Sequence, residues 1–529
     1  MIKLTNIQMP LDYTDVMIKD KVCQVLKLED ELITNITLLK RATITENKDT
    51  IHYKMTVGVS LHNSEEESRI SFIRRSKGAS YIQDYRYNVI PANRNSRPVV
   101  VGFGPAGIFA ALILAESGQS PIVLERGKPV DIRFSDINAF ASGGELDTQS
   151  NIQFGEGGAG AFSDGKLKPG LVDNKKYKVM SEFVKAGADE KILYLEKPHV
   201  GSDVLRKVVR NLREKIISLG GEVRFSSKFT RVITRGNKVY GVEYVSDGQV
   251  YEIPCDSVIL AIGHSARDTF DNLYNQGITM EQKPFGIGLR VEHPQEYMNK
   301  LQYGGEYDNP LLGPADYRLV THLDNGRSVY SFCMCPGGYV VPAASEQGGI
   351  CTNGMSEEAR DGKNANSALL VSVTPCDFPD KHPLSGIALQ RSIERAAFDI
   401  SGDFCAPVQR MEDFINGKNT TAFGDVSPTY KPGTIFAPHS SYMPDYIVSS
   451  LKSAIKDFDE WMNGFYYPDA LLTGPETRTT SPVRILRGDN LESADIEGLY
   501  PCGEGAGYAG GIISSAYDGL ICAEKILGK

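Results

Sequence analysis

A glycine-rich turn near residue 100 has the residue types and spacing that bind a dinucleotide. Residues 99–107 read Val-Val-Val-Gly-Phe-Gly-Pro-Ala-Gly, a β-branched run followed by G-x-G-x-x-G. In this motif the glycines allow a tight bend, close approach of a pyrophosphate and close helix–strand packing. An apolar segment follows, and the N–H groups that begin its helix would face the pyrophosphate. The residues predicted to contact the ligand here are Gly102, Gly104, Pro105, Ala106 and Gly107.

An acidic residue closes the next predicted strand. Glu125 follows Ile-Val-Leu at 122–124, where a carboxylate accepts hydrogen bonds from a ribose 2′-hydroxyl. It disfavours the 2′-phosphate of NADP, and it leaves both NAD and the ADP half of FAD open. Arg126 comes next, and the string Leu-Glu-Arg-Gly is similar to the strand ending of flavin-binding Rossmann domains.

A second glycine cluster lies in residues 128–170, which we expect to form a loop. Each glycine would destabilise a helix or strand by about 0.5–1 kcal/mol, so the cluster suits a backbone that curves around a flat or phosphorylated ligand. A disordered loop is the alternative. The segment resembles the glycine-rich loop of single-Rossmann flavoproteins, which lies near the pyrophosphate and flavin. This resemblance implies cofactor contacts from Gly157, Gly158, Gly160 and Ala161, with Ser163, Asp164 and Lys166 toward the flavin edge.

The C-terminal segment carries another signal. A buried strand is expected at 499–502, and a last helix is expected to begin near Ile512. The positive end of that helix would stabilise negative charge on a reduced flavin. The predicted contacts in this segment are Gly503, Glu504, Gly511 and Ile512.

The order of the predicted elements resembles the glutathione-reductase-type FAD fold with a single Rossmann domain. After the βαβ unit come a helix at 201–219 with Asp203 as N-cap, a strand at 222–225, a β-meander over 230–254 and a buried strand at 257–262. This resemblance implies that Val232 contacts the adenine, that Ala261 and Gly263 pass near the ADP, and that Glu504 binds the ribityl chain or pyrophosphate. FAD is therefore expected rather than NAD, which has no ribityl chain.

We expect an α/β protein in which the Rossmann-type FAD domain is interrupted. Residues 1–95 form a small α+β domain, 96–279 and 481–529 form the FAD domain, and 280–480 form an inserted α+β substrate or cap domain. The N-terminal domain is expected to have strands at 2–7, 33–38, 42–45, 51–59 and 70–73, and a helix at 15–28. Its role is open between a lid or docking unit and a stabilising appendage. Because no second G-x-G-x-x-G opens a helix after residue 280, an NAD(P) domain is not expected, although a nicotinamide donor could dock transiently.

Composition excludes several protein classes. The chain has 529 residues, a formal net charge of −9 and nine cysteines, without the spacing of paired zinc ligands. No stretch has the apolar length of a signal peptide or a membrane span. These features predict a reduced, cytoplasmic enzyme without a metal or a nucleic-acid partner, and they leave the oligomeric state open.

Candidates for catalysis lie in the region 280–480. Cys333 and Cys335 could form a redox-active pair, although structural or pocket cysteines are favoured over this interpretation. Arg290 and His293 are candidates for a pocket of the inserted domain. Arg478 belongs to a cationic segment, 477–487, which is either an anion-binding face or surface charge. We expect His264 to belong to a cofactor loop rather than to act as a general acid.

Five strings resemble those of a bacterial family of uncharacterised FAD-dependent dehydrogenases, also labelled NAD(FAD)-utilising dehydrogenases. The resemblance covers nearly the whole chain and implies FAD and the single-Rossmann fold, without a substrate. The strings are Gly-His-Ser-Ala-Arg-Asp-Thr (263–269), Phe-Cys-Met-Cys-Pro-Gly-Gly (332–338), Asn-Gly-Met-Ser (353–356), Asn-Ser-Ala-Leu (366–369) and Arg-Thr-Thr-Ser-Pro-Val-Arg (478–484).

The sequence therefore predicts an FAD-dependent oxidoreductase that transfers hydride through flavin N5. Its small or medium organic substrate would lie between the FAD domain and the inserted domain, and the protein would mainly position and tune the cofactor. The alternative is a flavin-binding protein that senses redox state or docks a partner without dedicated turnover. A flavin-dependent RNA-modifying enzyme is a third hypothesis, which the net charge disfavours.

Overall fold

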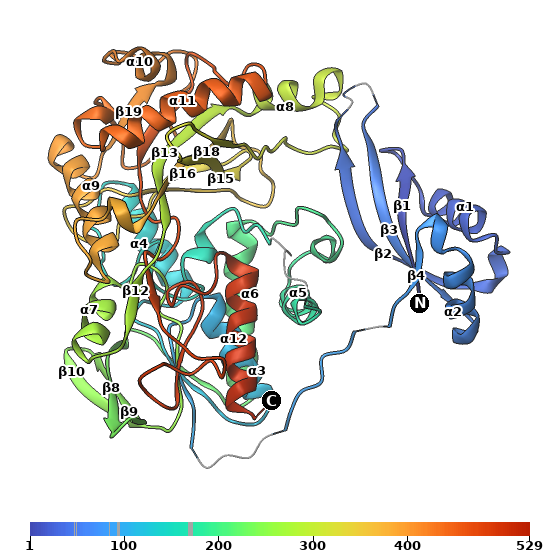
Figure 1. The fold of residues 1–529 in the computed structure, drawn as a ribbon, viewed down its shortest axis with the longest axis horizontal. Helices are drawn as coiled ribbons and strands as arrows, with labels where there is room; N and C mark the ends of the chain where they lie inside the picture. Colours follow the sequence, from blue (N-terminus) through green and yellow to red (C-terminus); the bar gives the residue numbers. More distant parts are fainter. Residues whose placement is uncertain (47, 49, 84, 92–95, 168–172, 529) are drawn as a thin grey trace.

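The N-terminal unit is a four-stranded antiparallel sheet, order β2-β3-β1-β4, with two helices (Figure 1). The computed structural model describes residues 1–528 except 47, 49, 84, 92–95 and 168–172. Alternate residues of β1 and β3 pack with the helices in a core of their own. The elements are β1 (Ile2–Met9), α1 (Asp15–Leu26), β2 (Ile33–Ile44), β3 (His52–Leu61), α2 (Ser64–Ile73) and β4 (Ala79–Tyr81).

Two predictions for this unit are wrong. Residues 70–73 form the last turn of α2 rather than a strand; Ile70 is buried in the core, whereas Phe72 is 80% exposed. Periodicity cannot separate a strand from a helix end in so short an apolar run. The two strands expected at 33–38 and 42–45 are one strand, β2, with a register shift between Leu38 and Lys40.

A five-stranded parallel sheet of order β23-β11-β5-β6-β7 forms the centre of the molecule. Val100 and its neighbours in register pack under helices, while Val99 and Val101 pack against the β-meander. Residues 99–101, 122–124 and 258–260 are buried on both faces and are continuously apolar, whereas the edge strand at 222–224 (Glu-Val-Arg) is half-buried and carries charges. The strands are β5 (Val99–Val101), β6 (Ile122–Leu124), β7 (Glu222–Arg224), β11 (Val258–Leu260) and β23 (Leu499–Pro501), with the meander β8 (Lys228–Arg235), β9 (Lys238–Ser246) and β10 (Gln249–Pro254).

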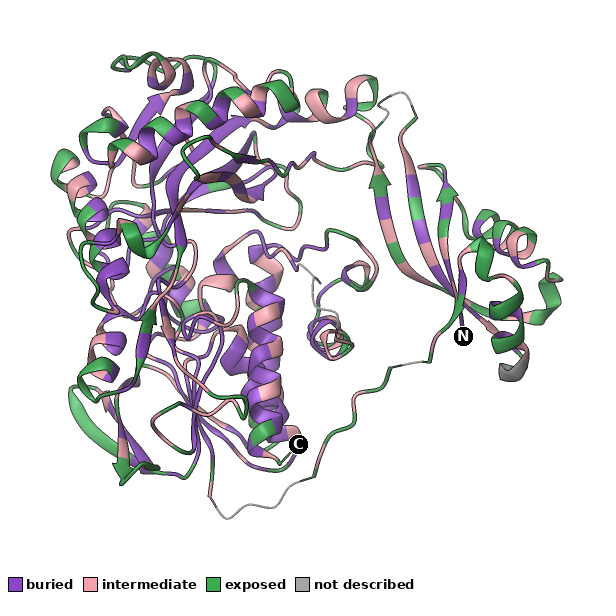
Figure 2. Cartoon of the chain, in the orientation of Figure 1, coloured by how far each residue is buried: buried purple, intermediate pink, exposed green. Residues whose placement is uncertain are grey.

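Three helices lie side by side over one face of this sheet: α3 (Pro105–Glu116), α6 (Ser202–Ser218) and α12 (Ile512–Ile526) (Figure 1). Residues 106–115 of α3 are buried on every side, as the uniformly apolar sequence predicts. Figure 2 shows that α3 and α12 are among the most buried helices of the chain. Within the described part of the chain, no helix has both the length and the apolar character that a membrane span requires.

A second, seven-stranded sheet has the order β14-β15-β18-β13-β21-β19-β20. The chain enters this region after β12 and leaves it before β22, and these two strands pair antiparallel, Met280 opposite Ile485. The domain boundaries predicted from sequence fall next to this pair. The seven strands of this sheet are β13 (Phe285–Pro294), β14 (Val320–His322), β15 (Ser328–Cys335), β18 (Asn364–Val373), β19 (Ala406–Arg410), β20 (Thr434–Phe436) and β21 (Leu471–Glu476). Two separate pairs are β12 (Met280–Gln282) with β22 (Val483–Ile485), and β16 (Tyr339–Pro342) with β17 (Thr352–Met355).

The helices of the remaining chain include one that the sequence analysis assigned to a loop. Within the stretch 128–170, residues Val130–Ala141 form α4, which packs against α6. The cap expected at Asp203 is also wrong: Gly201 precedes α6, and Asp203 instead accepts a hydrogen bond from the N–H of Glu358, 2.9 Å away. The other helices are α5 (Lys176–Lys185), α7 (Arg267–Asn275), α8 (Gln295–Tyr303), α9 (Ser385–Ser401), α10 (Met411–Asn416) and α11 (Asp445–Trp461).

Candidate functional site

The three glycines of the turn after β5 have distinct steric roles. Gly102 has φ +95°, and a Cβ there would lie 2.3 Å from the carbonyl oxygen of Ala261. A Cβ on Gly107 would lie 1.9 Å from the carbonyl oxygen of Gly102, so this glycine lets α3 pack on the turn. Gly104 directly precedes α3, and a Cβ there would be 3.6 Å from the Cα of Gly158. The two glycine-rich segments therefore meet at the first turn of α3.

A cavity lies at the carboxyl end of the parallel sheet, next to this turn. Most of the predicted cofactor contacts line it: Gly102, Gly104, Pro105, Ala106, Glu125, Arg126, Gly158, Gly160, Ala261, Gly263, Glu504, Gly511 and Ile512. A Cβ built on Gly263 or Gly511 would have no atom within 4 Å. Both glycines therefore border open space, where their backbone can approach a ligand.

Five predicted contacts do not line the cavity: Gly107, Gly157, Ala161, Val232 and Gly503. Gly157 packs against Ala161 and α6, because its Cβ would lie 2.7 Å from the Cβ of Ala161. The N–H of Val232 donates to the side chain of Gln276 at 3.0 Å, so it is not available to an adenine. Phe229, three residues earlier on β8, lines the cavity instead. The meander thus contributes its first residues, not its middle.

Glu125 organises the backbone around one end of the cavity. Its buried carboxylate accepts hydrogen bonds from the N–H groups of Phe103 (2.8 Å), Gly127 (2.8 Å) and Gly155 (3.0 Å). A carboxylate has about four acceptor positions. One position therefore remains for a ribose hydroxyl, while the other three hold the turn and the second glycine cluster in place.

Arg126 lies along the same wall and is fully engaged. Its guanidinium makes two hydrogen bonds to Asp268, at 2.9 and 2.8 Å, and lies 4.2 Å above the ring centre of Phe154. Burial alone would raise the pKa of Asp268, but hydrogen bonds and charge from Arg126 and Lys228 lower it below its ordinary value. Arg126 therefore joins β6 to α7 and closes this end of the cavity.

The C-terminal segment brings an acid and a helix N-terminus to the cavity. Burial raises the pKa of Glu504 to about 7, although the N–H of Gly511 and the charge of Lys283 oppose the shift. Gly503 turns away from the cavity and donates its N–H to Asp518 at 2.7 Å. Helix α12 begins at Ile512 without a side-chain cap. Because Gly511 and Ile512 line the cavity, the positive end of the helix dipole faces it.

The two cysteines of the C-x-C pair have different environments. Cys333 lines the cavity and has φ +41°, whereas Cys335 is buried and donates its thiol to the carbonyl of Cys333, 3.1 Å away. Burial raises the pKa of Cys335 to about 12. All nine cysteines of the chain are free thiols in the structure. A thiol with so high a pKa is a poor nucleophile at neutral pH.

Arg290 and His293 on β13 lie outside the cavity lining. The buried guanidinium of Arg290 binds Glu476 with two hydrogen bonds, at 2.7 and 2.6 Å, and donates to the carbonyl of Cys333 at 2.9 Å. Glu476 and Cys333 line the cavity, so Arg290 acts through them as a positioning residue. His293 bonds to the carbonyl of Phe465 at 2.9 Å, and burial lowers its pKa to about 4. The assignment of His293 to a pocket is therefore wrong, because it is a neutral core residue.

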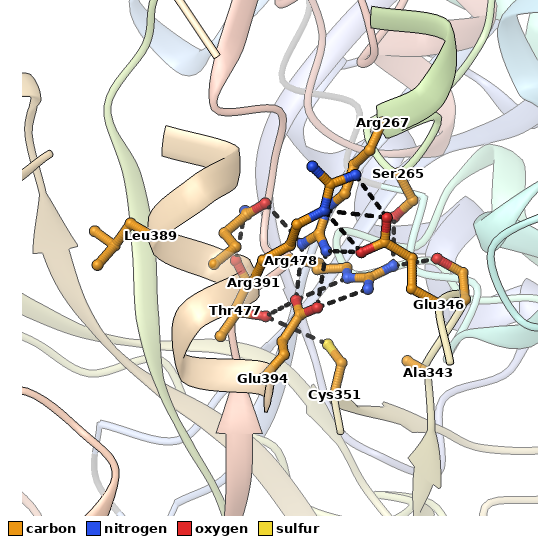
Figure 3. Close-up of polar contacts among 12 residues, drawn as sticks. Ser265, Arg267, Ala343, Glu346, Cys351, Leu389, Arg391, Glu394, Thr477 and Arg478 are labelled. Atoms are coloured by element: carbon orange, nitrogen blue, oxygen red, sulfur yellow. Dashed lines mark hydrogen bonds and ion pairs between the residues drawn. The ribbon is translucent and has the colours of Figure 1, made fainter. Parts of the chain in front are cut away.

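Arg478 lines the cavity and belongs to a buried ion cluster (Figure 3). Glu394 on α9 binds Arg478 at 2.9 and 2.8 Å, and it binds Arg267 on α7 at 2.9 and 2.8 Å. Arg267 also pairs with Glu346 at 2.6 Å, which in turn pairs with Arg391 at 2.7 Å. The segment 477–487 was interpreted as either an anion-binding face or surface charge. The second interpretation does not hold for Arg478, because this residue is only 6% exposed.

The ion cluster influences the protonation state of His264, which lines the cavity. Burial, together with the charges of Arg478 and Arg267, lowers the pKa of His264 to about 3. His264 is therefore neutral at physiological pH and serves as a hydrogen-bonding group. The string at 263–269 contained both His264 and Arg267, but nothing in the sequence indicated the partners Glu394 and Glu346, which lie far along the chain.

Comparison with known proteins identifies the family. The profile described as "FAD-dependent protein, C-terminal domain-like" matches residues 284–479. An uncharacterized protein of Clostridium beijerinckii is 46% identical over 533 residues, covering 100% of this chain and 99% of that protein.

Solved flavoproteins share less with the chain. CtdE in complex with FAD is 13% identical with a TM-score of 0.33, covering 82% of this chain and 84% of that one. Glycine oxidase from Bacillus cereus is 11% identical with a TM-score of 0.32, covering 82% of this chain and 95% of that one. On the family profile and the full-length relative, the chain belongs to the family of FAD-dependent proteins with this C-terminal domain, and FAD is its cofactor.

Proposed function

We propose that the chain is an FAD-dependent oxidoreductase with a glutathione-reductase-like, Rossmann-type FAD site. One observation supports this most strongly: the N-termini of two helices, α3 and α12, line the same cavity. FAD requires two such anion-stabilising positions, one for its pyrophosphate and one for the charge that develops on the reduced ring. A protein that bound only NAD would need the first position alone.

The residues around the cavity have separate tasks in this proposal. The N-terminus of α3 holds the pyrophosphate, with Gly104 and Gly158 allowing it to approach the backbone. Glu125 holds the ribose, and Glu504 the ribityl chain. Bound FAD supplies hydride transfer at N5. Arg478, fixed by Glu394, adds positive charge to the wall without needing to reorganise, which is the arrangement that stabilises developing negative charge.

The inserted region 280–480 covers the other side of the cavity and is the proposed substrate domain. It contributes Phe332, Cys333, Asn353 and Glu476 to the lining. Substrate would therefore meet the cofactor between the two sheets. We propose a small or medium organic substrate and a transient electron donor, in a reduced cytoplasmic setting.

Spectroscopy of the purified protein tests the proposal. We expect the absorption spectrum of bound flavin, release of FAD on denaturation, and anaerobic reduction by a chemical or nicotinamide donor followed by reoxidation with an organic acceptor. A colourless protein that does not take up FAD on reconstitution would overturn the cofactor site. Tightly bound FAD without turnover of a reductant would favour the alternative, a flavin-binding protein that senses redox state or docks a partner.

A further inference from the structure

A second, larger depression lies between the N-terminal sheet and the rest of the molecule. This groove has a volume of about 1950 Å³ and is lined by β1, β2, the segment after β4, α5 and the strands β14 and β15. Sites for small molecules are typically about 300–1,000 Å³. The backbone bridge between Arg41 and Leu195 and the ion pair of Lys40 with Glu196, at 2.7 Å, hold the N-terminal sheet at one wall.

The groove adjoins the cofactor cavity. Lys166, Phe332 and Cys333 line both. Lys166 lies on the second glycine-rich segment and donates to the carbonyl of Met334, which fixes it at the junction. The same glycine-rich segment approaches the start of α12, because a Cβ on Gly160 would lie 3.1 Å from the side chain of Ile512. The wall that the groove and the cavity share is therefore close to the helix end that we assign to the flavin ring.

The charge of the groove is opposite to that of the whole chain. The described residues of its lining include nine lysines and arginines but only three acids, Glu190, Glu196 and Asp316, whereas the whole chain has a net charge of −9. Some lysines are neutralised, such as Lys197 by Asp316 at 2.7 Å. Carboxylates just behind the wall also neutralise two lysines of α5: Lys178 pairs with Glu116 and Glu182, and Lys185 pairs with Glu182.

Three cations of the groove, Lys3, Arg86 and Arg318, form no ion pair with a carboxylate among the described residues. Burial and the charge of Lys3 lower the pKa of Lys176, so positive charges from β1 and α5 approach each other across the groove. A bound polyanion would relieve this repulsion.

Aromatic side chains line the same groove as these cations. Seven tyrosine and phenylalanine side chains line the described part of the groove. Tyr85 and Tyr177 are 37% and 46% exposed, and they are adjacent in sequence to Arg86 and Lys176. Exposed rings next to cations are the combination that holds unpaired bases by stacking and their phosphates by charge. An acidic polypeptide would use the cations but not the rings.

We propose that the groove binds single-stranded nucleic acid, with RNA as the probe that tests it. One unpaired base would then enter the cavity at Lys166, Phe332 and Cys333, which line both the groove and the cavity. This second step rests on the proposed function, whereas binding along the groove does not. The net charge of the whole chain predicts no nucleic-acid partner, but a strand responds to the local charge of the surface that it contacts.

The test uses the full-length, flavin-containing protein and a fluorescein-labelled single-stranded RNA of about 12 nucleotides. Fluorescence anisotropy should show binding that weakens roughly 50-fold between about 50 and 200 mM salt, the loss expected for about four neutralised phosphates. Lys3→Glu/Lys176→Glu should weaken binding at least tenfold, and Tyr177→Ala at least fivefold, since stacking supports each base. Lys207→Glu is the matched control and should bind as the wild type does, because Lys207 is an exposed residue of α6 outside the groove lining and forms no ion pair with a described residue.

Several results would overturn the inference. These are the absence of salt-dependent binding, equal loss in Lys207→Glu, equal affinity for duplex RNA of the same length, and displacement by poly-glutamate as effective as by unlabelled RNA. Flavin absorbance and circular dichroism, recorded on every sample, show whether each variant is folded; Arg86→Glu replaces any groove variant that is not. RNA binding by a protein without FAD would contradict only the proposed function, and FAD without RNA binding would contradict only the groove.

Discussion

Arg267 and Arg478 bind the same carboxylate, that of Glu394, from two different parts of the fold. Arg267 begins α7, directly after the central parallel sheet, whereas Arg478 follows β21 of the second sheet. Each arginine makes two hydrogen bonds of 2.8–2.9 Å to the carboxylate. The pair therefore connects the cofactor-binding sheet with the inserted region, next to the cavity.

Glu394→Gln should destabilise the protein strongly. Removing one partner of a buried ion pair typically costs about 3–5 kcal/mol, because the remaining charge has no compensation, and here two arginines lose it. Urea unfolding measures the loss. Glu346→Gln is the control: the Glu346 side chain is 33% exposed, so water can replace it and the loss should be smaller. Equal stability of Glu394→Gln and the wild type would contradict the structural role of the cluster.

Gly104→Val should abolish retention of FAD. A branched side chain at the start of α3 would occupy the space into which the pyrophosphate must approach, beside Gly158. We expect the flavin-to-protein absorbance ratio to fall at least tenfold. Gly305→Val is the matched control, because no atom lies within 4 Å of a Cβ there and its φ is not positive. Full retention of flavin in Gly104→Val would mean that the pyrophosphate lies elsewhere.

Glu125→Ala should weaken FAD binding and also destabilise the protein. Its carboxylate accepts three backbone N–H groups, and each buried donor left unpaired costs about 1–3 kcal/mol. Glu125→Gln retains one acceptor oxygen and should show a smaller loss of both properties. Flavin titration and urea unfolding separate the two effects. Normal FAD affinity in Glu125→Ala would show that the ribose is held by other groups.

Glu504 should give the flavin-free protein a characteristic pH dependence. Its pKa rises from 4.5 to about 7 in the folded state, so the folded protein binds the proton more tightly than the unfolded chain does. The stability from this group is complete below about pH 4.5 and is lost as the pH rises through 7, by up to about 3 kcal/mol. The difference in unfolding free energy between wild type and Glu504→Gln should decline over that window and then stay constant. A flat difference would place the Glu504 carboxyl in water.

Cys335 should resist alkylation at neutral pH. Burial raises its pKa to about 12, so almost no thiolate forms. Mass spectrometry after brief iodoacetamide treatment should find Cys376, which is exposed, modified and Cys335 unmodified. Anaerobic reductive titration should also consume two electrons per flavin. Uptake of four electrons would support a redox-active Cys333–Cys335 pair.

The parts of the site that could be predicted from sequence are those coded locally. Gly102, Gly104 and Glu125 belong to one continuous βαβ segment, and their types follow from turn geometry and strand ends. The start of α12 was predicted from a strand, glycines and a helix in succession, whereas Glu504 was predicted from the resemblance to the glutathione-reductase-type fold. Each of these residues lines the cavity, as expected.

The parts that were missed depend on contacts distant in sequence. Nothing local to Glu394 distinguishes a shared partner of two arginines from an ordinary acid on an amphipathic helix. Val232 was placed within the correct strand, but Phe229, three residues earlier on β8, lines the cavity. Helix α4 was assigned to a loop because the glycines that follow it dominated the composition of the segment.

The pairing of β12 with β22 determines how the inserted region is connected to the parallel sheet. Both crossings of the backbone into and out of the seven-stranded sheet lie next to each other, Met280 beside Ile485. The residues between β12 and β22 therefore form one continuous insertion into the part of the chain that holds the parallel sheet. Because both crossings lie at one place, the length of the inserted region can change without altering the order of the strands in the parallel sheet.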